Sequence, residues 1–154
     1  MAGLAHLGFG FAAKSLSPKI PLGILLVCPL LLDLIYMALA LFGVNEGFWS
    51  HSLMMALVYS LVVWAIAFLI TKKAKDSAIP GLLVLSHWVL DFITWPMLAV
   101  LDDPEGMLFY WDESFRFGLG LYRTIPGVIL GEAGITLTGI ALYVIWLKKK
   151  RRKK

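Results

Sequence analysis

The sequence places ionisable side chains inside long apolar runs, where such groups are energetically costly. His87 and Asp91 stand four residues apart in the run 78–101, within the stretch LSHWVLDFITW. On a helix, this i, i+4 spacing puts both side chains on one face. They can then bind one metal ion together, or the carboxylate can orient the imidazole. The pair is therefore the starting point of a candidate metal site.

Further ionisable side chains share the apolar segments with this pair. They are His6 in the N-terminal segment 1–13, Asp33 in the run 20–42, His51 at the start of the run 52–71, and Glu132 in the run 125–147. A charged side chain at the centre of a bilayer costs about 2.5–3.5 kcal/mol on insertion scales, so such groups usually mark function. At 1.5 Å of rise per residue, the groups on the long runs fall at a similar depth.

Three histidines and two carboxylates form the predicted ligand set. The set is His6, Asp33, His51, His87 and Asp91. Imidazole with carboxylate suits zinc, and also manganese or iron, so a divalent metal with zinc preferred is the expected cofactor. Asp33 and Asp91 are also the predicted catalytic groups, because a carboxylate that is not bound to the metal can act as general base.

Two interpretations stay open at this point. Glu132 can be an additional ligand, a proton-transfer group or a partner of Arg123. Each histidine, in turn, can make a structural hydrogen bond between helices instead of binding a metal.

Membrane-spanning helices must position these residues. The chain has 154 residues, of which 60% are hydrophobic, and its mean hydropathy is +0.82. Soluble domains are usually less than half apolar, so the pattern predicts one integral membrane domain over residues 1–154. A span needs about 20 apolar residues. Four runs meet this length: 20–42, 52–71, 78–101 and 125–147.

The N-terminal segment 1–13 is too short to cross a bilayer. It is followed by SLSPKIP (15–21), in which Pro18 and Pro21 indicate a turn. If residues 1–13 form a helix that folds back, His6 rises to about the level of Asp33. The predicted fold is therefore an all-α membrane protein with four transmembrane helices and a short re-entrant or interfacial N-terminal helix.

The distribution of basic residues predicts the orientation. Twelve of the 14 Lys and Arg residues fall on one side of a four-span chain, seven of them in the tail 148–154, whereas Arg116 and Arg123 fall on the other. Positive charge stays cytoplasmic, so both termini and the tail are expected in the cytoplasm. The pI near 9.3 does not predict a nucleic-acid partner, because half of the basic residues sit in one tail. The expected partners are the lipid bilayer and a lipid or amphiphilic substrate.

Four motifs carry a resemblance to a known family. They are AHLGFG (5–10), PLLLD (29–33), WSHS (49–52) and SHWVLD (86–91). In order and spacing they resemble the membrane-bound metal-dependent hydrolase family, the YdjM-like group of small bacterial membrane proteins, over about residues 5–97. The resemblance implies a bacterial inner-membrane protein and puts all five predicted ligands at family positions. This chain has PLLLDL where the family has a denser acidic segment, which disfavours a dinuclear centre.

These observations predict a metal-dependent hydrolase that acts on a lipid or amphiphile from the extracytoplasmic side. An ester, a phosphoester or an amide are all open as the bond cleaved. The alternatives are a proton- or metal-ion-conducting transporter component and a non-catalytic membrane scaffold. Gly127, Gly131 and Gly134 on the last run would permit the close helix contact of a homo-oligomer.

Overall fold

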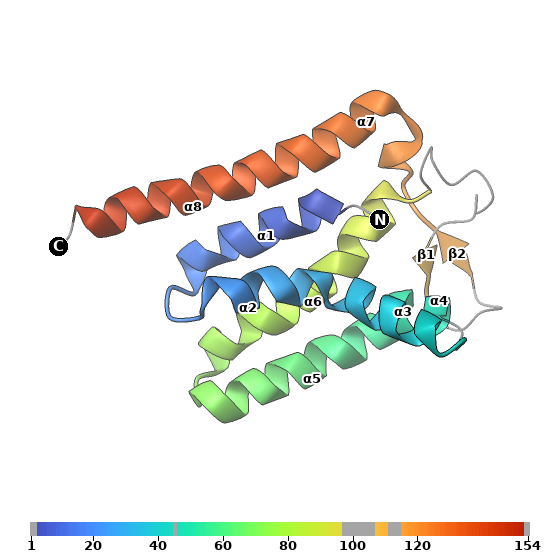
Figure 1. Ribbon diagram of the computed structural model, residues 1–154, viewed down its shortest axis with the longest axis horizontal. Coiled ribbons are helices and arrows are strands. Elements are labelled where there is room, and N and C mark those ends of the chain that lie inside the picture. The colour runs from blue at the N-terminus through green and yellow to red at the C-terminus, as the bar shows by residue number, and fades with distance from the viewer. Residues whose placement is uncertain (1–2, 45, 97–106, 111–114, 153–154) are drawn as a thin grey trace.

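A computed structural model describes residues 3–44, 46–96, 107–110 and 115–152. The chain is mostly helical (Figure 1). Its elements in order are α1 (Gly3–Leu16), α2 (Leu22–Val27), the 3₁₀ turn η1 (Cys28–Leu30), α3 (Leu31–Leu41), α4 (Glu46–His51), α5 (Leu53–Thr71), α6 (Ala74–Thr94), β1 (Met107–Leu108), β2 (Arg116–Phe117), the 3₁₀ turn η2 (Leu121–Arg123), α7 (Ile125–Ile129), the π-helical turn η3 (Leu130–Gly134) and α8 (Ile135–Arg151).

Four helical stretches are long and apolar enough to cross a membrane. They are Leu22–Leu41, Leu53–Thr71, Ala74–Thr94 and Ile125–Arg151. In the second stretch, only 6% of the most apolar 18-residue segment is buried inside the protein. In the fourth stretch, the corresponding share is 11%. Water-soluble monomers rarely expose apolar surface on this scale. The four helices therefore fit an integral membrane protein, and they agree in number and order with the four predicted runs.

Two of the four helices differ from the predicted runs by several residues. The third helix begins at Ala74 rather than at 78 and ends at Thr94. It ends there because Pro96 disfavours helical geometry at the residue before it; residues 97–101 of the predicted run lie outside the described residues. The last helix continues to Arg151, so the first four residues of the predicted basic tail belong to it. Basic side chains in a final helical turn are favoured by the helix dipole.

The first and last of these four helical stretches are both interrupted. The first changes from α to 3₁₀ geometry at Cys28–Leu30, where Pro29 has no backbone N–H to donate to the helix. The last contains the π-helical turn Leu130–Gly134. Such π turns occur frequently at functional sites in helices. Both interruptions lie beside the candidate site described below.

Helix α1 folds back along the bundle, where it lies beside α8 and α2 (Figure 1). Glycines allow the close approach. A Cβ at Gly8 would come within 2.6 Å of the Ile135 carbonyl oxygen, and a Cβ at Gly139 would overlap the backbone of Gly8. Small residues at such contacts let helix backbones meet. The short N-terminal helix expected from the sequence is therefore present and doubles back; its entry into a bilayer stays a prediction.

One end of the molecule carries structure that the all-α prediction did not include. The strands β1 and β2 form an antiparallel pair in which Met107 faces Phe117 and Leu108 faces Arg116. The indole nitrogen of Trp88 donates a hydrogen bond of 3.4 Å to the Leu108 carbonyl. A hairpin of this size is not stable alone, and it is held here by aromatic side chains of α6.

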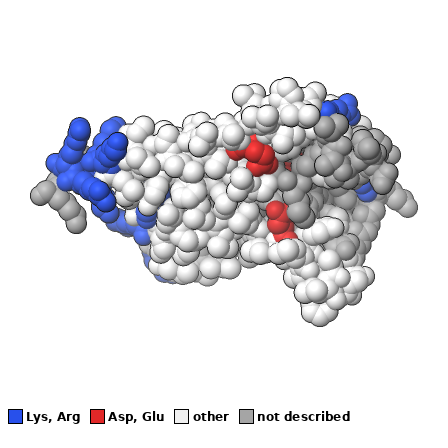
Figure 2. Space-filling model, turned by 45° about the horizontal axis from the view of Figure 1, so that its top comes forward, with Lys and Arg blue, Asp and Glu red and all other residues white. Residues whose placement is uncertain are grey.

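Most Lys and Arg side chains gather at the opposite end, near the C-terminus (Figure 2). We call this the basic end. It contains the turn between α1 and α2, the turn between α5 and α6, and the end of α8 (Figure 1). The three basic segments of the sequence therefore meet at one end of the bundle. That this end faces the cytoplasm stays a prediction.

Candidate metal site

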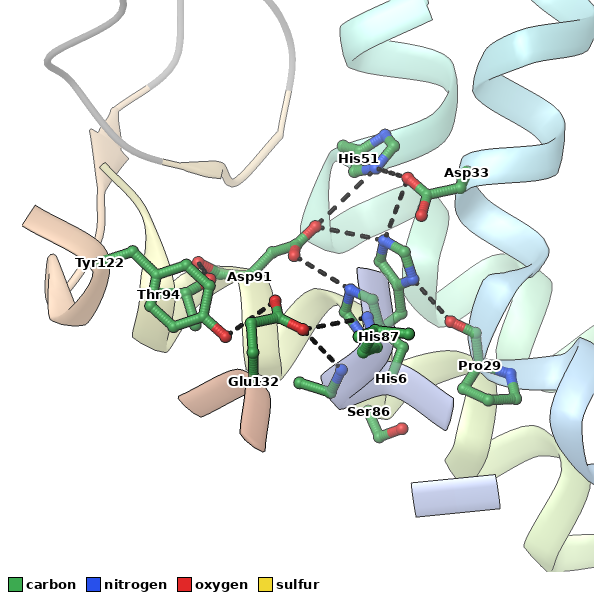
Figure 3. Close-up of polar contacts among 12 residues, drawn as sticks. His6, Pro29, Asp33, His51, Ser86, His87, Asp91, Thr94, Tyr122 and Glu132 are labelled. Atoms are coloured by element: carbon green, nitrogen blue, oxygen red, sulfur yellow. Dashed lines mark hydrogen bonds and ion pairs between the residues drawn. The ribbon is translucent and has the colours of Figure 1, made fainter. Parts of the chain in front are cut away.

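All five predicted ligands converge on one place in the bundle (Figure 3). The five side chains come from four helices that are widely separated in the sequence. His6 comes from α1, Asp33 from α3, His51 from the end of α4, and His87 and Asp91 from α6. His51 thus belongs to a short helix of its own and not, as expected, to the start of the second span.

Asp91 lies at the centre of the cluster. Its Oδ1 is 3.3 Å from Nε2 of His6. Its Oδ2 is 3.2 Å from Nε2 of His87 and 3.8 Å from Nε2 of His51. One carboxylate therefore contacts all three histidines of the chain, and the i, i+4 pair seen in the sequence is formed.

Asp33 faces the same histidines from the other side. Its Oδ1 is 3.3 Å from Nε2 of His51 and 3.7 Å from Nε2 of His87. The donor atoms form two overlapping groups that share His87: His6 with His87 and Asp91, and Asp33 with His51 and His87. Within each group, the atoms lie within 4.8 Å of one another.

The donor atoms fit a cation better than they fit one another. Among the described residues, five buried atoms of the cluster make no hydrogen bond of acceptable geometry: both ring nitrogens of His6, Nε2 of His87, and Oδ1 of Asp33 and of Asp91. Each buried polar atom without a partner costs about 1–3 kcal/mol. A cation would engage these lone pairs, and imidazole nitrogen with carboxylate oxygen is a common ligand set for first-row divalent metals. These buried His and Asp groups can therefore hold a metal ion.

Neighbouring groups orient the imidazole rings. Nδ1 of His87 lies 2.6 Å from the Pro29 carbonyl oxygen. Because a carbonyl only accepts, Nδ1 donates, and Nε2 of the neutral ring presents a lone pair to the cluster. Nδ1 of His51 lies 2.7 Å from Oγ of Ser50, so its Nε2 also faces inward. Such outer partners fix the ring orientation of metal-binding histidines.

His6 is positioned by stacking. Its ring lies 3.9 Å from the ring of His87, centroid to centroid, with an angle of only 6° between the planes. The two rings therefore approach the carboxylate of Asp91 side by side (Figure 3). This contact explains how a residue of the short N-terminal helix reaches a cluster built mainly on α6.

Among the described residues, the exposed part of the cluster lies at Asp33 and His51. His6 and His87 are fully buried and Asp91 is 4% exposed. The side chains of Asp33 and His51 are 16% and 18% exposed. The ring of Tyr36 stands edge-on to His51 at 5.6 Å. A small molecule would therefore reach the cluster past Asp33 and His51, between α3 and α4.

Glu132 lies next to the cluster but belongs to neither ligand group. Its Oε2 accepts hydrogen bonds of 3.0 Å from the backbone N–H groups of Leu4 and Ala5. Its Oε1 accepts a hydrogen bond of 3.0 Å from the Tyr122 hydroxyl. Glu132 thus caps the N-terminus of α1, where free N–H groups and the helix dipole favour a negative charge.

This role was missed at the sequence level, where the alternatives were a ligand, a proton-transfer group and a partner of Arg123. Among the described residues, no ion pair joins Glu132 to Arg123. Burial, and then the nearby Glu132 carboxylate, raise the pKa of Tyr122, so its hydroxyl stays protonated and donates. The cap joins residues 127 and 128 positions apart in the chain, and no local pattern reports such a contact.

Two serines near the cluster have structural contacts. Oγ of Ser52 accepts a hydrogen bond of 3.2 Å from the backbone N–H of Met55 and caps α5. Oγ of Ser86 donates a hydrogen bond of 2.7 Å to the Leu83 carbonyl within α6. Both contacts give these serines a structural role within their helices.

Comparison with protein-family models, with curated proteins and with solved structures finds no match to this chain. The resemblance to the membrane-bound metal-dependent hydrolases therefore stays a prediction from four motifs.

Proposed function

We propose that this protein is a membrane-embedded, zinc-dependent hydrolase of a lipid or another amphiphile. The observation that carries the proposal is a largely buried cluster of three imidazoles and two carboxylates, in which five buried nitrogen and oxygen atoms make no hydrogen bond of acceptable geometry. A scaffold would pair such groups by direct hydrogen bonds, because an unpaired buried group destabilises the fold. Here the His–Asp contacts of 3.2–3.3 Å are ion pairs only when the imidazole is protonated, whereas a bound cation would engage neutral imidazole and carboxylate together.

The residues divide into two roles. His6, His51 and His87 would hold the metal through Nε2, together with Asp91, which contacts all three. Asp33 is the more exposed of the two carboxylates and lies on the open side. It would act as general base and take a proton from the attacking water. When bound, a divalent cation supplies Lewis acidity and can lower the pKa of a coordinated water to about 7.

The surroundings of the opening favour an amphiphilic substrate. Helix α3, which carries Asp33, exposes Leu34 by 42% and Met37 by 52%. These side chains sit on a helix apolar enough to cross a membrane. A substrate with an apolar part would approach from the lipid and present its polar bond to Asp33 and His51. Because the cluster lies away from the basic end, we assign the reaction to the extracytoplasmic side of a bacterial inner membrane.

A proton or metal-ion pathway is the rival function, and the described core disfavours it. Between the cluster and the basic end, the described hydrophobic core includes Ala13, Leu25, Cys28, Leu83 and Val84. The buried polar side chains near the basic end are the hydroxyls of Ser17 and Ser77. Ion conduction requires polar groups or water along the path, and the described residues of this core supply neither charge nor imidazole beyond the cluster.

Metal analysis of purified protein tests the proposal. Wild-type protein should retain about one zinc ion per chain, and His87→Ala should lose it, because His87 is shared by both ligand groups. Ser86→Ala is the matched control, since Ser86 bonds only within its own helix and its loss should leave the metal in place. Wild-type protein without metal, after purification free of chelators, would overturn the proposal.

Activity is tested with detergent-solubilised protein and amphiphiles that carry an ester, a phosphoester or an amide. Turnover of one class by wild type, and its loss in Asp33→Asn with the metal retained, is the expected result. Metal binding without turnover of any class would favour the transporter alternative.

A further inference from the structure

A groove opens near the basic end of the bundle, between α2, α5 and the start of α6. Its volume is about 530 Å³, which lies in the range of small-molecule sites. The walls are apolar and include Ile24, Cys28, Val63, Ala67 and Pro80. None of these residues belongs to the His and Asp cluster, and the hydrolase proposed above makes no use of the groove.

The length of the groove matches one leaflet of a bilayer. Its lining on α5 runs from Thr71 at the basic end to Val63. These nine residues are separated by eight helical rises, which span about 12 Å at 1.5 Å per rise. Half of a hydrocarbon core of about 30 Å is about 15 Å. A single acyl chain that enters at the headgroup level would therefore be covered along most of its length.

Among the described residues that line the groove, the charged ones stand at its mouth. Lys19 and Lys73 line the mouth together with Asp76. Both lysines are exposed, and among the described residues neither forms an ion pair with a carboxylate. The mouth therefore carries a net positive charge at the end of the molecule where basic side chains gather (Figure 2). Basic groups beside a membrane attract anionic lipid headgroups.

We propose that this groove binds an anionic phospholipid, with one acyl chain along α5 and the phosphate between Lys19 and Lys73. The floor of the groove distinguishes it from ordinary lipid contact. Ile20 and Cys28 are each only 8% exposed, so a chain in the groove is enclosed by protein on more than one side. The lipid would be a bound component of the leaflet at the basic end. It would not be the substrate, because its phosphate and ester groups would lie at the basic end, away from the metal site.

The headgroup is tested by binding of phosphatidylglycerol and phosphatidylcholine to the purified full-length protein, measured by native mass spectrometry. Wild type should bind phosphatidylglycerol more tightly. The double variant Lys19→Ala/Lys73→Ala should lose roughly tenfold or more of that affinity. The double variant Lys75→Ala/Lys149→Ala removes the same charge at the same end outside the groove, and should lose much less. Equal losses in both variants, or equal binding of the two lipids, would overturn the proposal.

The acyl chain is tested separately with the lysines intact. Ala67 lines the groove, whereas Ala65 is exposed on the same helix and does not. Ala67→Trp should fill the groove and abolish tight binding of phosphatidylglycerol, and Ala65→Trp should leave binding unchanged. If Ala67→Trp binds the lipid as wild type does, the chain does not enter the groove and the assignment fails. Metal content, measured in parallel, separates this outcome from a failure of the hydrolase proposal.

Discussion

Replacing Glu132 with alanine should weaken metal binding, although Glu132 is in neither ligand group. The substitution removes two backbone hydrogen bonds at the start of α1 and one from Tyr122. Hydrogen bonds to charged groups contribute about 1.5–3 kcal/mol each, and a charge at a helix N-terminus about 0.3–1 kcal/mol. The Leu4 N–H is exposed, so water recovers part of this loss.

We therefore expect a net loss of about 1.5–3 kcal/mol in the docking of α1, which carries His6. A metal ion that uses His6 as a ligand binds only the state in which α1 is docked. A smaller population of this state therefore lowers the apparent metal affinity. Since about 1.4 kcal/mol corresponds to a factor of ten, the metal affinity of Glu132→Ala should fall by about 10–100-fold.

Glu132→Gln separates positioning from ligation. The glutamine oxygen can still accept from the N–H groups of Leu4 and Ala5, and its NH₂ group can donate to the Tyr122 hydroxyl oxygen. Only the charge is lost, so affinity should fall by less than tenfold. A metal ligand would behave differently, because an amide is a poor substitute for a carboxylate in a zinc site.

Zinc affinity of the three proteins would be measured in detergent by competition with a chromophoric chelator, after circular dichroism shows equal helix content. The expected order of affinity is wild type, then Glu132→Gln, then Glu132→Ala. Equal affinities in wild type and Glu132→Ala would show that α1 is held by other contacts. Equally large losses of zinc affinity in both variants would show that Glu132 is a metal ligand and that its effect does not come from capping α1.

Three further predictions test the placement of the site. A reporter active only in the cytoplasm should work when fused after Lys154 and fail when inserted near Glu105, because twelve of the 14 basic residues lie on one side; the reverse pattern would place the cluster at the cytoplasmic face. Deleting residues 1–13 should lower metal content without preventing insertion of the four spans, and His6→Ala should do the same without removing α1; unchanged metal in both would exclude His6 as a ligand. Asp91→Asn should weaken zinc binding by about 10–100-fold if Asp91 only orients the histidines, and by more if Asp91 is a ligand. If the variant binds zinc as tightly as wild type does, the cluster is a structural hydrogen-bond network and not a metal site.

The sequence alone determined the elements that carry the site. The number and order of the four helices long enough to cross a membrane follow from the length of the apolar runs, because the thickness of a bilayer sets the length that a crossing helix needs. His87 and Asp91 lie on the same helix face because they are four residues apart and every α-helix has about 3.6 residues per turn. These features depend on nearby residues, and the structure reproduces them.

Only the tertiary structure decided how distant elements meet. Three contacts join segments that lie far apart in the chain. His6 stacks on His87, the Pro29 carbonyl orients the His87 imidazole, and Glu132 caps α1. They depend on which helix faces approach each other, and this is fixed by backbone contact at Gly8 and Gly139 and by the turns that interrupt the first and last spans. Hydropathy cannot report such contacts, since a buried face and a lipid-facing face are equally apolar in a membrane.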